Sequence, residues 1–344
     1  MEKKIKVSII IPIYNAEKSL ELCLRSIMIQ SLKEIEILCI NDGSLDNSLK
    51  ILENLNKEDN RIIIVNKKNG GASSARNMAL KIAKGEYCLN IDSDDWIEQG
   101  YLENLYNKAK KDNLDITISN IIFDFKNNSK KNYVVNDLNI DQDKIITGKE
   151  YINIFFNGNG HGYTWNKLIK RELYIKNNLW YDEEIFLLED VEILMMLAYY
   201  TKNIGKINKA YYHYIQGENN GSQKIKVDRL YDILTCMNKL IKFYSKNNED
   251  EIINLIKQDK YLHLLSRIIE NNYLGKEKYK EFILKFIAEI KQENKIIFRK
   301  ELFKNRYKSF LITIFKMIKS LNIRMGILII EIAKIIILIK GKLK

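Results

Sequence analysis

The chain has 344 residues, of which 46% are hydrophobic and 29% charged, and this length allows two domains or one sheet domain with a helical extension. Its net charge of +12 is unevenly distributed, since residues 1–290 hold 42 Lys and Arg against 41 Asp and Glu, whereas residues 291–344 hold 14 against 3. The basic tail carries no aromatic- and glycine-rich recognition module, so the composition argues against nucleic-acid binding.

The first 91 residues predict strands that alternate with helices. Apolar runs at residues 7–13, 35–40, 62–65 and 86–91 are typical of strands buried on both faces of a parallel sheet. Apolar residues at helical spacing predict connecting helices over about 16–30, from 49 to 55, and over 73–83. This order predicts an α/β fold with a doubly wound, mostly parallel sheet flanked by helices.

Polar residues follow each of the four predicted strands. In order, they are Tyr14 and Asn15, then Asp42, then Arg76 and Asn77, then Asp92-Ser93-Asp94-Asp95. Ligands of such sheets bind at the carboxyl ends of the strands, where these residues converge. Closely spaced carboxylates repel one another unless a cation lies between them, so the last run predicts a metal-bound phosphate.

Four segments in this order resemble the signature of family 2 glycosyltransferases, which have the GT-A fold. They are VSIIIPIYN at 7–15, NDGS at 41–44, GGASSARN at 70–77 and DSDD at 92–95. The segments at 164–171 and 187–192 are similar to the acceptor-side segments of the family. The resemblance covers about residues 5–220, and it implies a nucleotide half at about 1–110 and an acceptor half at about 111–220.

The resemblance implies that the first half binds a UDP-sugar. Tyr14 would lie against the base and Asp42 would accept a hydrogen bond from its ring N–H, with Pro12 and Asn15 beside them. Arg76 would reach the nucleotide or a phosphate oxygen. The alternatives are a rim aromatic for Tyr14, a helix-capping turn residue for Asp42 and an exposed helix arginine for Arg76.

The acidic run would hold a divalent cation that bridges the two phosphates. Asp94 would coordinate it, and Asp92, next to Ser93, would contact the ribose or the shell of the metal. Oxygen ligands of this kind suit Mn²⁺ or Mg²⁺. Asp95 is expected instead to cap a helix that starts near Trp96.

The acceptor half would supply the base. In the family this is an acidic pair that opens a helix, and Glu189-Asp190 matches it, with Asp190 accepting the proton of the acceptor hydroxyl. Attack opposite a metal-held leaving group would be a single in-line displacement that inverts the anomeric configuration. The alternative is that these acids only stabilise the first turn of the helix.

Three further residues have expected roles on this side. Trp165 and Asn166 would shape the floor of the acceptor pocket, although Trp165 also fits a plain core position. His213 would be a further metal ligand, as a late histidine is in some related enzymes. A structural histidine is the alternative for His213.

Beyond residue 220 the apolar spacing is helical. Residues 221–295 predict a helical domain that packs against the sheet and offers a surface for a homo-oligomer. Residues 296–344 predict a basic amphipathic tail. Its longest apolar stretch, 326–339, is shorter than the roughly 20 residues of a spanning helix, so we expect a helix in the lipid interface with lysines near anionic head groups. The alternative is a basic helix packed on the domain or on a second subunit.

Together these features predict an inverting, metal-dependent glycosyltransferase that moves a hexose or N-acetylhexosamine from a UDP-sugar to a saccharide or lipid-linked acceptor in bacterial-type surface polysaccharide synthesis. The four cysteines lack metal-type spacing and no secretory core follows Met1, so a cytoplasmic protein on the inner face of the membrane is expected. A non-catalytic sugar-nucleotide or polysaccharide-binding protein and a nucleotidyltransferase are the alternatives.

Overall fold

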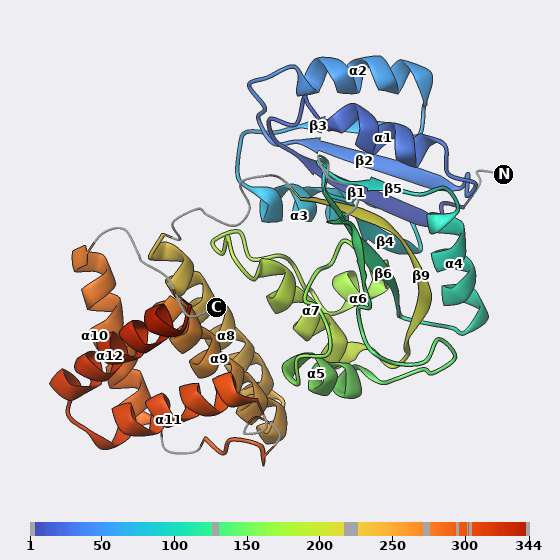
Figure 1. Cartoon of the computed structure of the whole chain (residues 1–344). Helices are drawn as coiled ribbons and strands as arrows, with labels where there is room; N and C mark the ends of the chain where they lie inside the picture. The colour runs from blue at the N-terminus through green and yellow to red at the C-terminus, as the bar shows by residue number, and fades with distance from the viewer. Residues whose placement is uncertain are drawn as a thin grey trace. The chain divides into compact units, whose positions relative to one another are not determined.

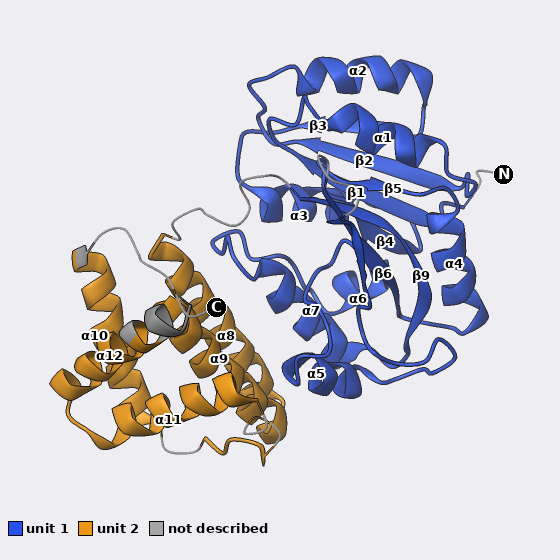
Figure 2. Cartoon of the chain, in the orientation of Figure 1, with its two compact units in different colours: residues 1–220 blue, residues 221–344 orange. Residues whose placement is uncertain are grey.

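The computed structural model describes residues 4–125, 131–216, 226–270, 276–293, 296–300, 302 and 305–341. The chain divides into two compact units, residues 1–220 and 221–344 (Figure 2).

The first part of unit 1, which the sequence predicts to be the nucleotide half, alternates strands and helices as expected (Figure 1). Its four strands form a parallel sheet in the order β3-β2-β1-β4. The two central strands are almost completely buried because both faces of the sheet are covered, which explains why Ile, Leu and Val predominate in them. The elements are β1 Val7–Ile13, α1 Leu20–Met28, β2 Ile35–Asn41, α2 Ser48–Glu58, β3 Ile62–Asn66, α3 Ala72–Ile82 and β4 Tyr87–Asn90.

The second part of unit 1, which the sequence predicts to be the acceptor half, extends the same sheet in a mixed arrangement. Strand β8 runs antiparallel to both β4 and β6, while β9 runs parallel to β6. The short β7 pairs antiparallel with β6, and helices α5 and α7 pack together. The elements are β5 Trp96–Ile97, α4 Tyr101–Lys111, β6 Ile116–Phe125, β7 Tyr133–Val135, α5 Gly148–Phe156, β8 Lys167–Lys170, α6 Arg171–Lys176, α7 Glu189–Tyr200 and β9 Ile204–Gln216.

This architecture confirms the predicted α/β fold with a sheet flanked by helices and a C-terminal helical extension. One local prediction is wrong, because no helix starts near Trp96. Trp96 and Ile97 instead pair with His213 and Tyr212 as strand β5, and the next helix begins at Tyr101. The long β9 captures this segment at the sheet edge.

Unit 2 is helical, as its periodicity predicts. Its helices are α8 Asp228–Lys246, α9 Asp250–Glu270, α10 Lys276–Gln292, α11 Arg306–Ser320 and α12 Ile323–Gly341. The last two helices contact α9 and α10, and α11 buries Leu311, Phe315 and Ile318. In the part of the chain that the structure describes, no helix combines the length and apolarity that a bilayer crossing requires.

Candidate active site

A cavity of about 480 Å³ opens at the carboxyl ends of the parallel strands in unit 1. The loops after β1, β2 and β4 and the start of α3 form its walls. Of the residues predicted to bind donor or metal, it is lined by Pro12, Tyr14, Asn15, Asp42, Asp92, Ser93 and Asp94. Ile13, Ala16, Ser19, Asn69, Gly71 and Ala72 complete the lining. The structure therefore brings seven of the predicted residues together in one cavity, whereas Arg76 and His213 do not line it.

The loops after β1 and β2 are tied to each other at the rim. The Ser44 hydroxyl accepts from the Asn15 N–H at 3.1 Å, and the Leu45 N–H donates to the Asn15 side-chain oxygen at 2.8 Å. Asn15 adopts a left-handed conformation with φ of 50°, which asparagine tolerates better than most residues. Tyr14 next to it is half exposed and lines the cavity.

Asp42 is buried and organises the loop that opens α3. Its Oδ1 accepts from the Lys67 ammonium at 2.6 Å and from the Gly70 N–H at 3.0 Å, and its Oδ2 accepts from the Gly71 N–H at 2.7 Å. Gly71 has φ of 89°, a conformation that favours glycine. Asp42 therefore holds three donors in place, and its contact with a uracil ring stays a prediction.

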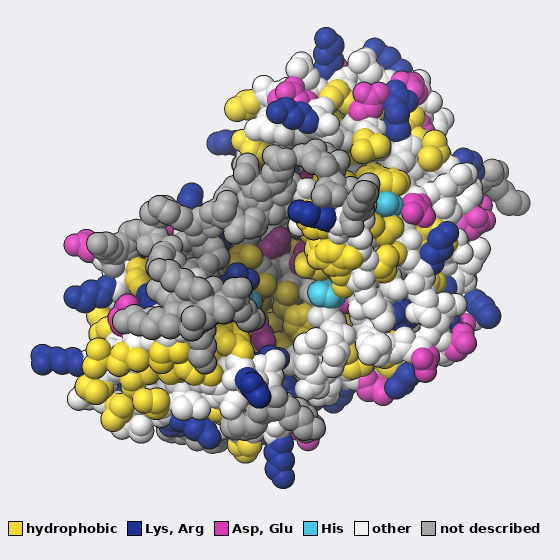
Figure 3. All heavy atoms as spheres, viewed as in Figure 1, with side chains coloured by type: hydrophobic (Ala, Val, Ile, Leu, Met, Phe, Trp, Pro, Cys, Tyr) yellow, Lys and Arg dark blue, Asp and Glu magenta, His cyan; other side chains and the backbone are white. Residues whose placement is uncertain are grey.

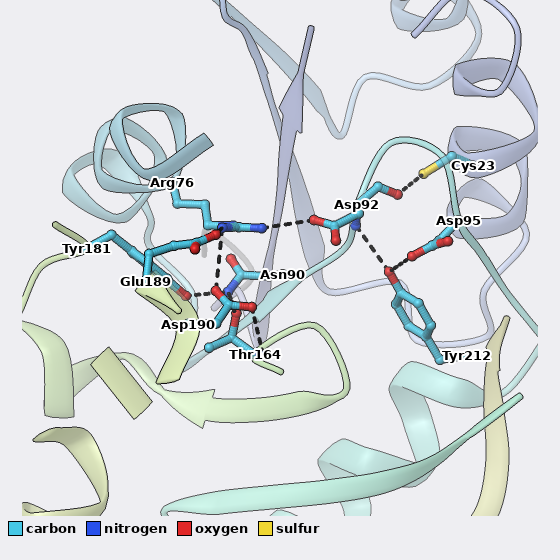
Figure 4. Close-up of polar contacts among 10 residues, drawn as sticks. All are labelled: Cys23, Arg76, Asn90, Asp92, Asp95, Thr164, Tyr181, Glu189, Asp190 and Tyr212. Atoms are coloured by element: carbon cyan, nitrogen blue, oxygen red, sulfur yellow. Dashed lines mark hydrogen bonds and ion pairs between the residues drawn. The ribbon is translucent and has the colours of Figure 1, made fainter. Parts of the chain in front are cut away.

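Arg76 connects the donor side to the acceptor side of unit 1 (Figure 4). It is only 4% exposed, so an exposed helix arginine is excluded. One terminal nitrogen lies 3.0 Å from Asp92, and the other lies 3.4 Å from both Glu189 and Asp190. The guanidinium also lies 5.4 Å from the centre of the Tyr181 ring. One cation thus compensates three clustered carboxylates.

Burial makes two of these carboxylates, Asp92 and Glu189, harder to ionise. It raises the pKa of Asp92, and the nearby Arg76 guanidinium opposes that shift. Burial also raises the pKa of Glu189, and the neighbouring Asp190 adds to this effect. Burial is an electrostatic cost that proteins commonly accept at functional sites.

Asp190 lies in the first turn of α7, after Leu188 in a left-handed conformation. Thr164 donates two hydrogen bonds to the Asp190 carboxylate. The Thr164 hydroxyl donates to Oδ1 at 3.0 Å, and the Thr164 N–H donates to Oδ2 at 3.2 Å. The Asn90 amide, at the end of β4, donates in turn to the Thr164 hydroxyl oxygen and to the Tyr181 hydroxyl oxygen. Asp190 is therefore fixed to the end of the strand that carries the acidic run.

Asp95 does not cap a helix, contrary to the prediction. It is 1% exposed, and its carboxylate accepts from the Tyr212 hydroxyl at 2.7 Å and from the Ile215 N–H at 2.8 Å. The Tyr212 hydroxyl oxygen accepts in turn from the Asp92 N–H (Figure 4). Burial, together with the charges of Asp92 and Asp94, raises the pKa of Asp95 to about 8. Asp95 and Tyr212 thus hold the acidic run against β9.

The structure places His213 against two other carboxylates. Its Nδ1 lies 3.0 Å from Asp124 and its Nε2 lies 3.3 Å from Glu98, while its ring stacks on Trp96 at 3.6 Å. A metal would have to displace one of these carboxylates from the ring. The metal-ligand role of His213 stays a prediction.

Trp165 and Asn166 are buried below the surface of the acceptor half. The Asn166 amide donates to the Ser119 carbonyl and to the Asp137 carboxylate, which also pairs with the fully buried Lys167 at 2.7 Å. These contacts hold the segment that carries Thr164. A pocket-floor role for the two residues is not tested by these positions.

Among the residues that the structure describes, no three or more His, Cys, Asp or Glu side chains form a ready-made metal cluster. The donor set at the cavity nevertheless fits a hard cation, because Asp92 and Asp94 both line it with carboxylates. Mg²⁺ is commonly bound by one or two carboxylates together with substrate phosphates, so the two residues suffice as the protein's share.

Thr164, Tyr181 and Tyr212 belong to this site although the sequence did not single them out. Thr164 lies within a segment that resembles the family, but its bond to Asp190 joins residues 26 positions apart. Tyr212 reaches Asp95 across 117 positions. No local pattern marks such partners.

The comparisons with known proteins identify the family of the chain. The family model "Glycosyl transferase family 2" matches residues 8–177. A cholesterol galactosyltransferase of Borreliella burgdorferi is 32% identical over 309 residues, which cover 84% of each protein. The putative glycosyltransferase EpsH of Bacillus subtilis is 33% identical over 211 residues, and the match spans 60% of its length and 60% of this chain. The minor teichoic acid biosynthesis protein GgaB of Bacillus subtilis is 29% identical over 297 residues, 80% of this chain and 31% of GgaB.

Solved structures share the fold. The crystal structure of Staphylococcus aureus TarS residues 1–349 in complex with UDP-GlcNAc has a TM-score of 0.66 to this chain at 19% identity. The superposition covers 92% of this chain and 90% of TarS 1–349. This likeness confirms the GT-A type of architecture.

Proposed function

The chain belongs to glycosyl transferase family 2 and is a glycosyltransferase, and on this premise we propose that it transfers a hexose or N-acetylhexosamine from a UDP-sugar to a saccharide or glycolipid acceptor. The transfer inverts the anomeric configuration and depends on Mn²⁺ or Mg²⁺. The product belongs to a bacterial-type surface polysaccharide.

The observation that carries the proposal is the Arg76 bridge. It joins Asp92, which lines the donor cavity, to the Glu189-Asp190 pair at the start of α7. The carboxylate turn and the proposed base therefore lie on either side of one guanidinium. The acceptor hydroxyl then attacks a donor held in the cavity from the side on which Asp190 lies.

The donor class is supported by the cavity and by the fold relative. TarS 1–349 was crystallised with UDP-GlcNAc, and the cavity here has an aromatic rim residue, Tyr14, beside the buried Asp42. An aromatic face and a carboxylate are the partners that a uracil ring requires. The sugar itself is left open by these residues.

Asp92 and Asp94 would hold the divalent cation, which neutralises charge on the departing diphosphate when it is bound. Arg76 adds a fixed positive charge at the same edge and orients the Asp92 carboxylate. The leaving group then needs no protonating acid.

Asp190 accepts the proton of the acceptor hydroxyl. The two hydrogen bonds from Thr164 fix the plane of its carboxylate, and a remaining lone pair can accept the proton of the alcohol. A single base opposite a bound leaving group gives one displacement and an inverted product.

The experiment that tests this function incubates the purified protein with a panel of UDP-, GDP- and dTDP-sugars, with and without Mn²⁺, and measures release of the free nucleotide. We expect hydrolysis of UDP-sugars only, and only with the metal. Equal hydrolysis with and without Mn²⁺, or a preference for another nucleotide, would contradict the proposal. The two alternative functions are not adopted, because neither is an activity of this family.

We also propose that residues 296–344 attach the enzyme to an anionic membrane on its cytoplasmic face. Support comes from α12, which exposes Met325, Leu328 and Ile332 in a segment of net charge +11 from residue 291. Co-sedimentation with phosphatidylglycerol vesicles tests this, with phosphatidylcholine vesicles as the control. Leu328→Ser combined with Ile332→Ser should abolish the binding, and unchanged binding would contradict the assignment.

A further inference from the structure

A row of aromatic rings leads away from the proposed base in unit 1. The Tyr163 ring stacks on Trp165 with ring centres 4.8 Å apart, and Tyr214 stacks on the same Trp165 at 5.2 Å. Phe123 meets the Tyr214 ring edge-on at 5.2 Å and stacks on Tyr133 at 5.0 Å. The row thus joins β6, β7, β9 and the segment before β8.

The inner end of the row lies at the reaction centre. Thr164, which binds Asp190 through two hydrogen bonds, is flanked in sequence by Tyr163 and Trp165. Trp165 also stacks on Tyr212 at 4.4 Å, and the Tyr212 hydroxyl accepts from the Asp92 N–H. An acceptor chain that extends from the base along this row would therefore meet Tyr163 and Tyr214 next.

Exposure increases along the row. Trp165 is 3% exposed, whereas Tyr163, Tyr214 and Phe123 are partly buried and pack on the core from outside. Tyr133, at the outer end, is 51% exposed. Figure 3 shows hydrophobic side chains, a class that includes Phe, Tyr and Trp, gathered in a patch on unit 1 in the region of β6 and β9. An exposed patch of contacting rings is more typical of a binding surface than of ordinary surface scatter.

We propose that Phe123, Tyr133, Tyr163 and Tyr214 form an aromatic platform that binds the saccharide chain of the acceptor beyond the sugar that reacts. This inference rests on the proposed function and specifies the acceptor as an oligosaccharide or polysaccharide. If the platform binds the chain, affinity increases with the length of the acceptor.

The chemistry of the platform favours a saccharide over a sterol or an acyl chain. Sugar rings present C–H faces that stack on aromatic rings, and hydroxyl edges that need polar partners. All of the rings except Phe123 carry a phenol hydroxyl, which can meet the hydroxyl edge of a sugar. A sterol, which has a single hydroxyl, would cover these phenol hydroxyls and offer few hydrogen bonds in return.

The test uses the full-length protein on an array of defined saccharides graded from single sugars to hexasaccharides, with cholesterol in detergent micelles as a separate arm. Tyr133→Ala removes the outer ring at a half-exposed position far from Asp190. We expect about a fivefold to tenfold loss of affinity for the longest saccharides that bind, and unchanged affinity for single sugars. Tyr133→Phe keeps the ring and should retain at least half of the affinity.

Tyr200→Ala, which removes a partly exposed tyrosine of α7 outside the platform, is the matched control and should bind like the unaltered protein. Equal loss in Tyr200→Ala, no loss in Tyr133→Ala, or a loss confined to cholesterol would overturn the platform. Metal-dependent hydrolysis of UDP-sugars is measured on the same preparations. Because Tyr133 lies outside the donor cavity, hydrolysis should be unchanged, so failure of the platform and failure of the proposed function give different results.

Discussion

The donor side and the acceptor side of unit 1 are built in different ways. On the donor side, each polar residue directly follows a strand of one parallel sheet, so the order of the strands alone brings the residues to one edge. On the acceptor side, Asp190 is positioned by Thr164, Asn90 and Arg76, which come from three other elements. The order of the strands thus positions the residues of the donor cavity, whereas long-range contacts position the proposed base.

Because of this difference, substitutions on the two sides should affect different steps of the reaction. A donor-side residue such as Asp94 is exposed and has freedom to meet a ligand, so its loss should affect binding of the metal and the nucleotide. Asp190 is fixed by neighbours, so its loss should affect the chemical step.

Replacing the proposed base should have the largest effect. Asp190→Asn keeps the shape and the contact with the Thr164 hydroxyl but cannot accept a proton from the alcohol. We expect kcat for transfer to fall by about 10²–10⁴-fold with UDP affinity unchanged. Transfer is measured with a saccharide acceptor, and UDP affinity by calorimetry.

Glu192→Gln is the matched control for this experiment. Glu192 lies in the same helix α7, and burial raises its pKa to about 7. It has no contact with Arg76 or Thr164 among the described interactions, so its neutral isostere should retain transfer activity. If Asp190→Asn kept full activity, the base would have to be another residue.

Removing the exposed acid of the cavity should have the next largest effect. Asp94→Ala deletes a carboxylate ligand, and we expect about a 10²–10³-fold loss of activity, equivalent to several kcal/mol of metal stabilisation. The gain in UDP affinity that Mn²⁺ gives to the unaltered protein should also disappear. Asp112→Ala at the end of α4 is the control. If the unaltered protein and Asp94→Ala each bound UDP equally well with and without Mn²⁺, the metal assignment would be refuted.

The donor side could be predicted from the sequence because its pattern is local. A buried strand followed by a polar turn occurs four times, and the structure confirms each strand. Most of the predicted donor-side residues line one cavity, although Arg76 does not. Knowing which residue follows which strand suffices, since parallel strands end at the same edge. The precise partners of those residues, such as Lys67 for Asp42, were not predictable.

The contacts of the acidic run could not be predicted. Asp94 and Asp95 are adjacent and chemically identical, yet the first is exposed at the cavity and the second is buried against Tyr212. The distinction arises from β9, which begins more than 100 positions later and captures Trp96 and Ile97 as a strand. Local propensity predicted a helix there, and tertiary pairing overrode it.

Arg76 tests whether the two sides depend on each other. Arg76→Lys keeps the positive charge but replaces a planar fork, which meets Asp92 on one side and the Glu189-Asp190 pair on the other, by one ammonium group. We expect about a tenfold loss of kcat/KM because only one side can be held at a time. Arg25→Lys, at an exposed arginine that pairs with Glu21 on α1, is the control. Full activity of Arg76→Lys would show that the bridge is dispensable.

The smallest expected effect is on stability and concerns Asp95. Its pKa is about 8 in the folded protein, whereas an unfolded aspartate titrates near pH 4. The folded state therefore binds more protons in between, so the stability that Asp95 contributes is fully present below about pH 4 and is lost as the pH rises to about 8. Asp95→Asn cannot ionise and weakens the bond with the Tyr212 hydroxyl, so it should be about 1 kcal/mol less stable than the unaltered protein at about pH 5. That deficit should shrink or reverse at about pH 8.5 in urea unfolding, whereas Asp112→Asn, at a partly buried aspartate that pairs with Lys108, should show no such change. A deficit of the same size at both pH values would mean that Asp95 is ionised in the folded protein, and that the acidic run is held to β9 by a charged contact.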